Sequence, residues 1–180
     1  YTCLLEAACM AVAYGLGDRL AMVALELRAL GELGFVGYLL AWTSTTALLV
    51  FPAAFVAGVQ FPQLVALLGR GRAGVGRQLG AAYACNTLGA VLGSIAGGFG
   101  LLPALTAPGC WRLVVVLLLA LGLVAVGIAW HRERLRAGVV WPVAIAAIAA
   151  ACLSGAGPTA AWRHSGIGAG RGGTAGSVNA

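Results

Sequence analysis

The amino-acid sequence predicts an all-α fold, a polytopic helical membrane bundle of about five transmembrane helices followed by a Gly-rich C-terminal tail. The first observation behind this prediction is composition. Of the 180 residues, 61% are hydrophobic and 9% are charged, whereas soluble domains average about 25% charged residues. The second observation is that uncharged apolar runs of helical length recur, without the strict alternation of β-barrel strands. These features exclude a soluble fold and a disordered chain.

Five apolar segments are long enough to consider as spans, because a helix needs about 20 residues to cross a hydrocarbon core of about 30 Å. The fourth, 113–130, is uncharged and is flanked by Trp111 and Trp130, and such aromatic residues are typical of membrane interfaces. In the second segment, Pro52 and Pro62 are expected to kink and end the helix. The five predicted spans are 1–17, 35–61, 79–105, 113–130 and 138–157.

The loops between these spans differ in their arginine content. Loops 61–78 and 131–137 are the two richest in Arg, and two spans separate them, so both must lie on one side of the membrane. The positive-inside rule places both in the cytoplasm. Segment 18–34 predicts an amphipathic helix on the membrane surface. The net charge of +6 is therefore assigned to membrane orientation and anionic lipid, and not to nucleic acid.

The third span contains the most specific local pattern, NTLGAVLGSIAGG. Gly89, Gly93 and Gly97 recur every four residues, so on a helix they form a stripe on which another helix packs closely. Asn86 shares that face, where a buried amide needs an interhelical hydrogen bond. The pattern predicts a helix-packing seam. The alternative is a substrate or ion contact at Asn86 and Thr87.

Glu6 is an acidic residue within the first apolar run. An ionisable group inside a span is a functional-site hypothesis, and the alternative is that Glu6 lies near a membrane interface. Glu6, Asn86 and Thr87 are the candidate intramembrane polar site. The hydroxyls of residues 43–46 are expected to bond carbonyls one turn back, the alternative being a polar path. The five cysteines and two histidines lack metal-site spacing, so we expect free buried thiols, no metal and no cofactor.

Three stretches carry a resemblance to a known family. They are QFPQLVALLGRGRAGVGRQLGAAYACNTLGAVLGSIAGGFGLLPAL at 60–105, PTAAWRHSGIGAGR at 158–171 and ELRALGELGFVGYLLAW at 26–42. Together they resemble the membrane part of bacterial fused transporter-like/spermidine-synthase proteins. The resemblance implies a multi-pass protein of the bacterial inner membrane. In that family the stretch matching 158–171 lies where the aminopropyltransferase domain begins. The resemblance therefore implies a transmembrane module at 1–157 and a junction at 158–180, and the junction residues are Trp162, Arg163, His164 and Ser165.

The resemblance implies a module that anchors a downstream synthase-like domain or passes polyamine to it. That domain would take decarboxylated S-adenosylmethionine as co-substrate. None of the family's catalytic or cofactor-binding residues can be assigned to this sequence, because it does not include the positions of the enzyme domain. The only Asp is Asp18, in a loop. We therefore expect a piece of a longer protein that is inactive as an enzyme alone. The expected partners are the lipid bilayer, its own downstream domain and polyamine.

Two other classes of function stay open. GLGDRL at 15–20 is similar to a loop motif of major-facilitator transporters, although its Gly-Arg continuation is missing, so a fragment of a secondary transporter is the main alternative. The third interpretation is a purely structural anchor. The side of the membrane on which the tail lies is open as well. If 138–157 crosses the membrane fully, the tail lies opposite the Arg-rich loops. If 138–157 is a re-entrant segment, the tail lies on the same side as those loops.

Overall fold

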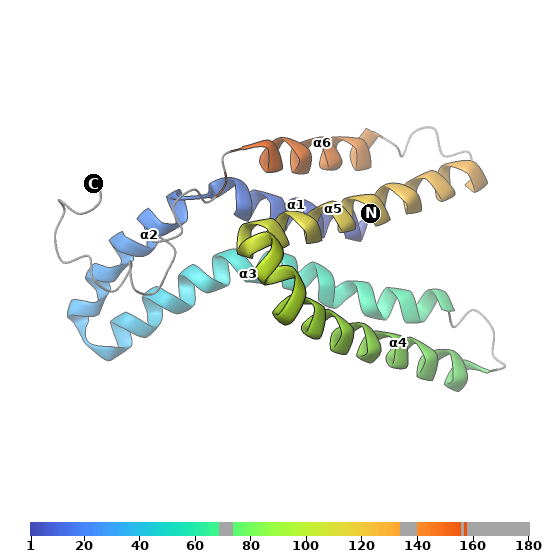
Figure 1. The fold of residues 1–180 in the computed structure, drawn as a ribbon, viewed down its shortest axis with the longest axis horizontal. Coiled ribbons are helices and arrows are strands. Elements are labelled where there is room, and N and C mark those ends of the chain that lie inside the picture. The colour runs from blue at the N-terminus through green and yellow to red at the C-terminus, as the bar shows by residue number, and fades with distance from the viewer. Residues whose placement is uncertain (69–73, 134–139, 156, 158–180) are drawn as a thin grey trace.

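The structure is a computed structural model that describes residues 1–68, 74–133, 140–155 and 157 (Figure 1). In this part of the chain every regular element is a helix, which confirms the predicted all-α class. Two stretches are long and apolar enough to cross a membrane, 35–67 and 75–131. The elements are α1 (Thr2–Leu16), α2 (Arg19–Leu27), η1 (Arg28–Leu33), α3 (Phe35–Leu68), α4 (Val75–Ile95), η2 (Ala96–Leu101), α5 (Leu102–Glu133) and α6 (Val140–Ser154).

Helix α1 forms the centre of the fold and contacts α3, α5 and α6. Its small residues Ala7 and Ala11 are completely buried, and they form the core with Val115 of α5 and Ala149 of α6. Because alanine side chains are short and lie one turn apart, the neighbouring helix backbones approach closely. Gly122 of α5 shows the same close approach, since a Cβ atom added there would lie 2.5 Å from a methyl group of Leu4.

Helix α3 is longer than its predicted span. It contains 34 residues and therefore extends about 51 Å, at 1.5 Å per residue. The prediction that Pro62 ends this helix is wrong, because α3 continues to Leu68 with both Pro52 and Pro62 inside it. A proline removes one backbone hydrogen bond from a helix, whereas unwinding the next turn in apolar surroundings leaves several polar groups unpaired.

The segment before α3 is helical, as predicted for 18–34, and consists of α2 and η1. After a sharp corner, the first half of α3 runs back along α2 and η1 (Figure 1). Gly37 permits this corner, because a Cβ atom added there would collide with the carbonyl oxygen of Leu30.

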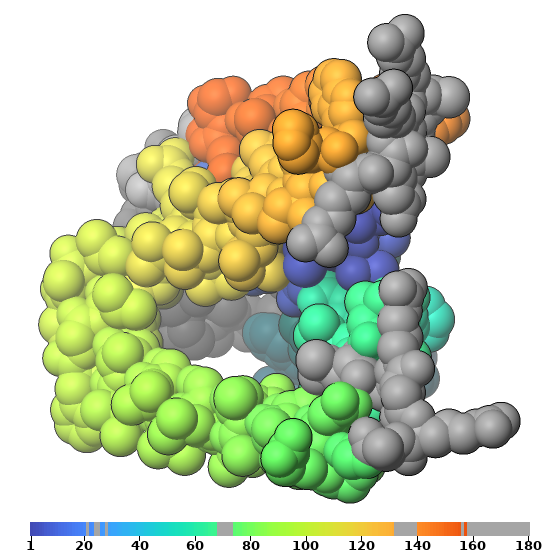
Figure 2. Space-filling view, turned by 90° about the vertical axis from the view of Figure 1, so that its right-hand side faces the viewer, coloured from blue at the N-terminus to red at the C-terminus, as the bar shows by residue number. Residues whose placement is uncertain are grey.

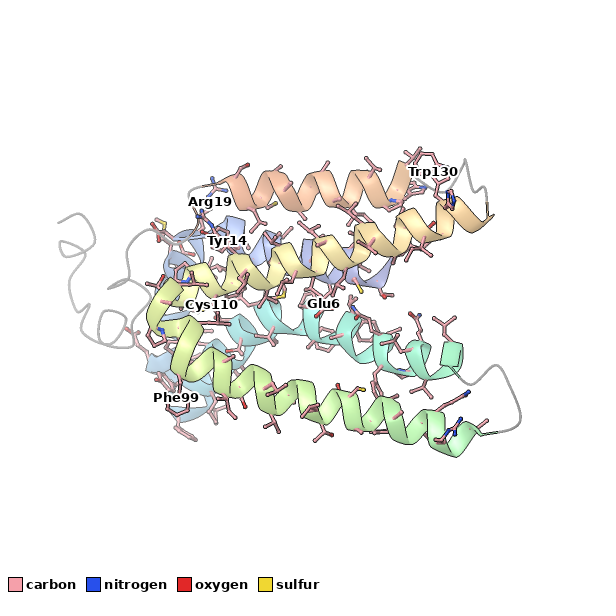
Figure 3. The ribbon with its side chains drawn as sticks, turned by 45° about the vertical axis from the view of Figure 1, so that its right-hand side comes forward. Glu6, Tyr14, Arg19, Phe99, Cys110 and Trp130 are labelled. Atoms are coloured by element: carbon pink, nitrogen blue, oxygen red, sulfur yellow. The ribbon has the colours of Figure 1, made fainter. Side chains whose placement is uncertain are left out.

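The apolar run 75–131 reverses direction at Thr106. This residue has a φ of 62° and a ψ of 170°, a backbone conformation that non-glycine residues rarely adopt. Pro108 follows within the first turn of the continuing helix. Figures 1 and 3 show α4 running toward this bend and α5 running back from it. The bend falls where the predicted third span ends, at residue 105.

The ends of the long helices gather at two opposite ends of the molecule. The end of α3, the start of α4, the end of α5 and the start of α6 lie at the right of Figure 1, next to the predicted Arg-rich loops. The end of α1, the bend at Thr106 and the end of α6 lie toward the other end. Residues 69–73 and 134–139 of those loops lie outside the described residues. So does the tail 158–180, with the predicted junction residues Trp162, Arg163, His164 and Ser165.

Candidate functional site

Glu6 takes part in a polar contact between α1 and α3. The Nε2 atom of Gln60 donates a hydrogen bond of 2.5 Å to Oε2 of Glu6. The thiol of Cys3 lies 3.8 Å from Oε1 of the same Gln60 side chain, to which it donates. All three side chains are half-buried. Figure 3 labels Glu6 between the α1 and α3 ribbons, and Glu6 lies about one turn from the start of α1.

This contact fastens two helices together. A carboxylate that accepts from an amide forms a charge-assisted hydrogen bond, which is stronger than a neutral one. Gln60 uses both ends of its amide, since Nε2 donates to Glu6 and Oε1 accepts from Cys3. Among the described residues, no group of three or more His, Cys, Asp or Glu side chains is arranged to hold a metal ion. The chemistry that this contact shows is interhelical hydrogen bonding.

The other residues of the predicted polar site lie elsewhere. Asn86 and Thr87 belong to α4 and are exposed. Figure 2 shows an opening between α4 and the part of the molecule that contains α1. The structure thus does not bring Asn86 and Thr87 to Glu6, whose amide partner is Gln60. Gln60 was not among the residues predicted from the sequence, although a polar amide within the second apolar run indicates a candidate functional residue.

The predicted packing seam on α4 faces open space in the described part of the chain. A Cβ atom added at Gly89, Gly93 or Gly97 would meet no neighbouring atom within 4 Å, and α4 has no buried residue. Packing of a helix on this stripe stays a prediction. The close helix contacts that the structure contains lie on α1, at Ala7 and Ala11.

The remaining predicted groups have ordinary surroundings. The hydroxyls of Ser44 and Thr45 donate to carbonyls of the preceding turn, at 2.7 Å from Leu40 and 2.9 Å from Ala41, which confirms that expectation for these two residues. The cysteines are free, and four of them are half-buried. The expectation of buried thiols is wrong for Cys85, which lies on exposed α4.

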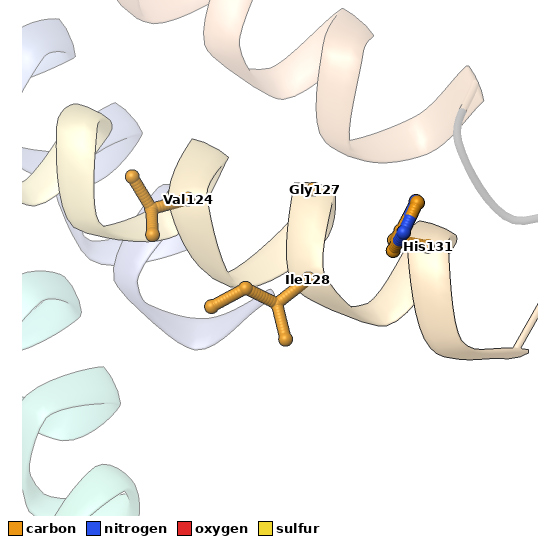
Figure 4. A pocket seen from close by; sticks show the side chains of 4 residues that line it. All are labelled: Val124, Gly127, Ile128 and His131. Atoms are coloured by element: carbon orange, nitrogen blue, oxygen red, sulfur yellow. The ribbon is translucent and has the colours of Figure 1, made fainter.

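A shallow depression of about 520 Å³ lies along α5 (Figure 4). Its lining residues are Val124, Gly127, Ile128 and His131, all from this one helix. A binding site for a small polar molecule needs several convergent polar groups. Among the lining residues that the structure describes, His131 alone has a polar side chain, so these residues do not make such a site.

A second group of interacting polar residues lies where α5 begins its long apolar run. The indole Nε1 atom of Trp111 donates a hydrogen bond of 3.0 Å to the carbonyl oxygen of Met10 in α1. The guanidinium carbon of Arg112 lies 5.0 Å from the ring centroid of Tyr14, which is within the range of a cation–π interaction. The sequence indicated Trp111 as an interfacial residue, but it did not predict the contact between Arg112 and Tyr14.

Comparison of the chain with models of known protein families, with curated proteins and with solved structures finds no match. The resemblance to the membrane part of spermidine-synthase-like proteins therefore stays an expectation from the sequence.

Proposed function

We propose that this chain is a multi-pass membrane module that anchors a downstream synthase-like domain. The observation that supports it best is the apolar exterior of the helices. Large hydrophobic side chains are exposed on every long helix, and the most exposed include Phe99 at 86%, Phe35 at 74% and Trp141 at 74%. Water would not stabilise such a surface, and hydrocarbon would.

The arrangement of the helices supports five crossings. α1, α3, α4, α5 and α6 all run lengthwise along the molecule, α1 and α6 over a shorter stretch than α3 and α5 (Figure 1). α1 and α6, with 15 residues each, are about 23 Å long at 1.5 Å per residue, so their crossing requires local thinning of the bilayer or extension of the span by flanking residues. Under this proposal the Arg-rich loops 61–78 and 131–137 share the cytoplasmic side.

The downstream synthase-like domain in this proposal is inferred from segments 60–105 and 158–171, which resemble the membrane part and the domain junction of fused spermidine-synthase proteins. Within the described residues, the polar contacts across helices include the Glu6–Gln60, Trp111–Met10 and Tyr14–Arg112 pairs. All three hold helices together, which favours anchoring over passage of polyamine through the module.

The proposal is tested by membrane fractionation followed by labelling of single cysteines. In a variant without the native cysteines, Gly74→Cys and Ala137→Cys should react with a membrane-impermeant maleimide from the same side. Gly34→Cys, placed between η1 and α3, should react from the opposite side. Recovery of the chain in the soluble fraction would overturn the proposal. Labelling of Gly74→Cys and Ala137→Cys from different sides would overturn the number of spans.

A further inference from the structure

Three helices meet around Tyr14 near one end of the molecule. α1 ends two residues after Tyr14, and the ring itself is only 4% exposed. Gly157, just beyond the end of α6, lies so close that a Cβ atom added there would collide with the Tyr14 ring. From α5, the guanidinium of Arg112 lies over the same ring. Tyr14 is thus a buried aromatic surface that holds one arginine in place.

The arginine held on this ring is suited to bind a phosphate. Arg112 itself is exposed. A guanidinium stacked on an aromatic face presents its N–H groups at the edge of its plane, and this edge matches the geometry of two phosphate oxygens. The hydrogen bond from Trp111 to Met10 fixes the adjoining backbone of α5 against α1. Arg112 is therefore positioned before any ligand arrives, which lowers the entropic cost of binding.

A second cation, Arg19, lies near the same end of α1. Arg19 begins α2, is exposed, and follows Tyr14 by five residues across the turn at Gly17. Figure 3 labels Arg19 and Tyr14 at the same end of the bundle. Asp18 belongs to the same turn and has an interaction of its own.

The depth of this group agrees with the position of lipid headgroups. Arg112 directly precedes the uncharged run 113–130, and Tyr14 lies in the last turn of apolar α1. When these helices cross a bilayer, both residues lie at the boundary between hydrocarbon and headgroups, where aromatic and basic side chains are favoured. We propose that Arg112 and Arg19, supported by the Tyr14 ring, bind the phosphate of an anionic phospholipid. This inference rests on the proposed membrane function.

Binding is measured by titration of the full chain, purified in detergent, with dioctanoyl-phosphatidylglycerol, dioctanoyl-phosphatidylcholine or inorganic phosphate. Phosphatidylglycerol should bind about tenfold more tightly than phosphatidylcholine, whose choline offsets the phosphate charge. Inorganic phosphate should bind weakly, because it lacks acyl chains. Equal affinity for the two lipids would overturn the site, and phosphate binding as strong as that of phosphatidylglycerol would overturn its assignment to lipid.

Substitutions locate the site. Arg112→Gln should weaken phosphatidylglycerol binding about tenfold, as expected for the loss of a charged hydrogen-bond donor. Arg77→Gln removes an exposed arginine at the other end of the bundle and should leave binding unchanged. Equal affinities of the wild type and Arg112→Gln would refute the assignment. If Arg112→Gln does not fold, Arg19→Gln provides the same test from an exposed helix start.

Flotation with phosphatidylcholine vesicles separates this inference from the proposed function. A chain that does not float with vesicles refutes the membrane proposal itself. A chain that floats but shows no preference for phosphatidylglycerol in the titration refutes the headgroup site alone.

Discussion

The side-chain amide of Gln60 donates a 2.5 Å hydrogen bond to the carboxylate of Glu6 and so connects α3 with α1. The two residues are 54 positions apart in the sequence. Each is a polar side chain in a mostly apolar helix, so each supplies a hydrogen-bond partner that the other needs in a medium without water.

Removal of the amide should destabilise the chain. Gln60→Leu leaves the Glu6 carboxyl group half-buried without its donor, and we expect a loss of about 1–3 kcal/mol in the free energy of unfolding. Thermal and denaturant unfolding in detergent measures this loss. The double variant Glu6→Leu/Gln60→Leu should recover part of it, because neither polar group then remains unpaired.

Gln63→Leu is the matched control, because Gln63 is exposed on the same helix. Its stability should stay within about 0.5 kcal/mol of the wild type, as for ordinary surface substitutions. Equal effects of the Gln60 and Gln63 substitutions would show that the contact with Glu6 does not stabilise the fold.

Two glycines in neighbouring helices should respond differently to the same substitution. Gly122→Leu places a side chain against Leu4, whose methyl group would lie 2.5 Å from the new Cβ atom. We expect a loss of about 1–3 kcal/mol from overpacking between α1 and α5. Gly93→Leu enters open space, and leucine favours the helix by up to about 1 kcal/mol over glycine.

Unfolding of both glycine variants in detergent checks this difference. A large loss for Gly93→Leu would mean that a helix does pack on the stripe of Gly89, Gly93 and Gly97, either in a second copy or in another segment. Tolerance of Gly122→Leu would show that α1 and α5 are not in close contact.

The hydrogen bond from Trp111 to Met10 gives a third prediction. Trp111→Phe keeps an aromatic ring but removes the donor to the Met10 carbonyl, and we expect a loss of about 1 kcal/mol in stability. Trp130→Phe is the control, because Trp130 is 52% exposed near the opposite end of α5. When α1 is perturbed by Gly15→Leu, tryptophan fluorescence should change less in the Trp111→Phe variant than in the Trp130→Phe variant, because Trp111→Phe removes the indole that is bonded to α1. Identical behaviour of the two variants would argue against the bond to Met10.

The sequence predicted the helical class and several boundaries because these depend on local pattern. The apolar run that includes 79–105 does reverse after residue 105, where Thr106 and Pro108 interrupt regular geometry. The sequence placed the seam of small residues on α4, whereas the structure has its close contacts at Ala7 and Ala11 of α1. Both helices carry small residues four apart, so spacing alone does not determine which one is covered.

The candidate polar site was predictable only in part, for a similar reason. An acidic residue in an apolar run stands out, so Glu6 was identified directly. Its partner depends on which helices become neighbours, and that is a property of tertiary packing. Asn86 and Gln60 are both amides within apolar helices, and the packing of α1 on α3 brought Gln60 to Glu6.

The last prediction is that this chain alone has no aminopropyltransferase activity. Transfer of an aminopropyl group requires a deprotonated amine aligned with a sulfonium carbon, held in a preorganised pocket. The tail 158–180 contains no acidic residue to bind a cationic amine or accept its proton. Its Arg163 and Arg171 would repel a polyamine.

The test supplies the purified 180-residue chain with decarboxylated S-adenosylmethionine and putrescine and measures spermidine by mass spectrometry. We expect no product above that of a heat-denatured sample. If the proposed partner domain exists, a longer chain that continues beyond residue 180 into a synthase-like domain should form spermidine under the same conditions. Turnover by the 180-residue chain itself would instead place a catalytic site within the helices or the tail, where no acid–base pair of the required kind has been identified.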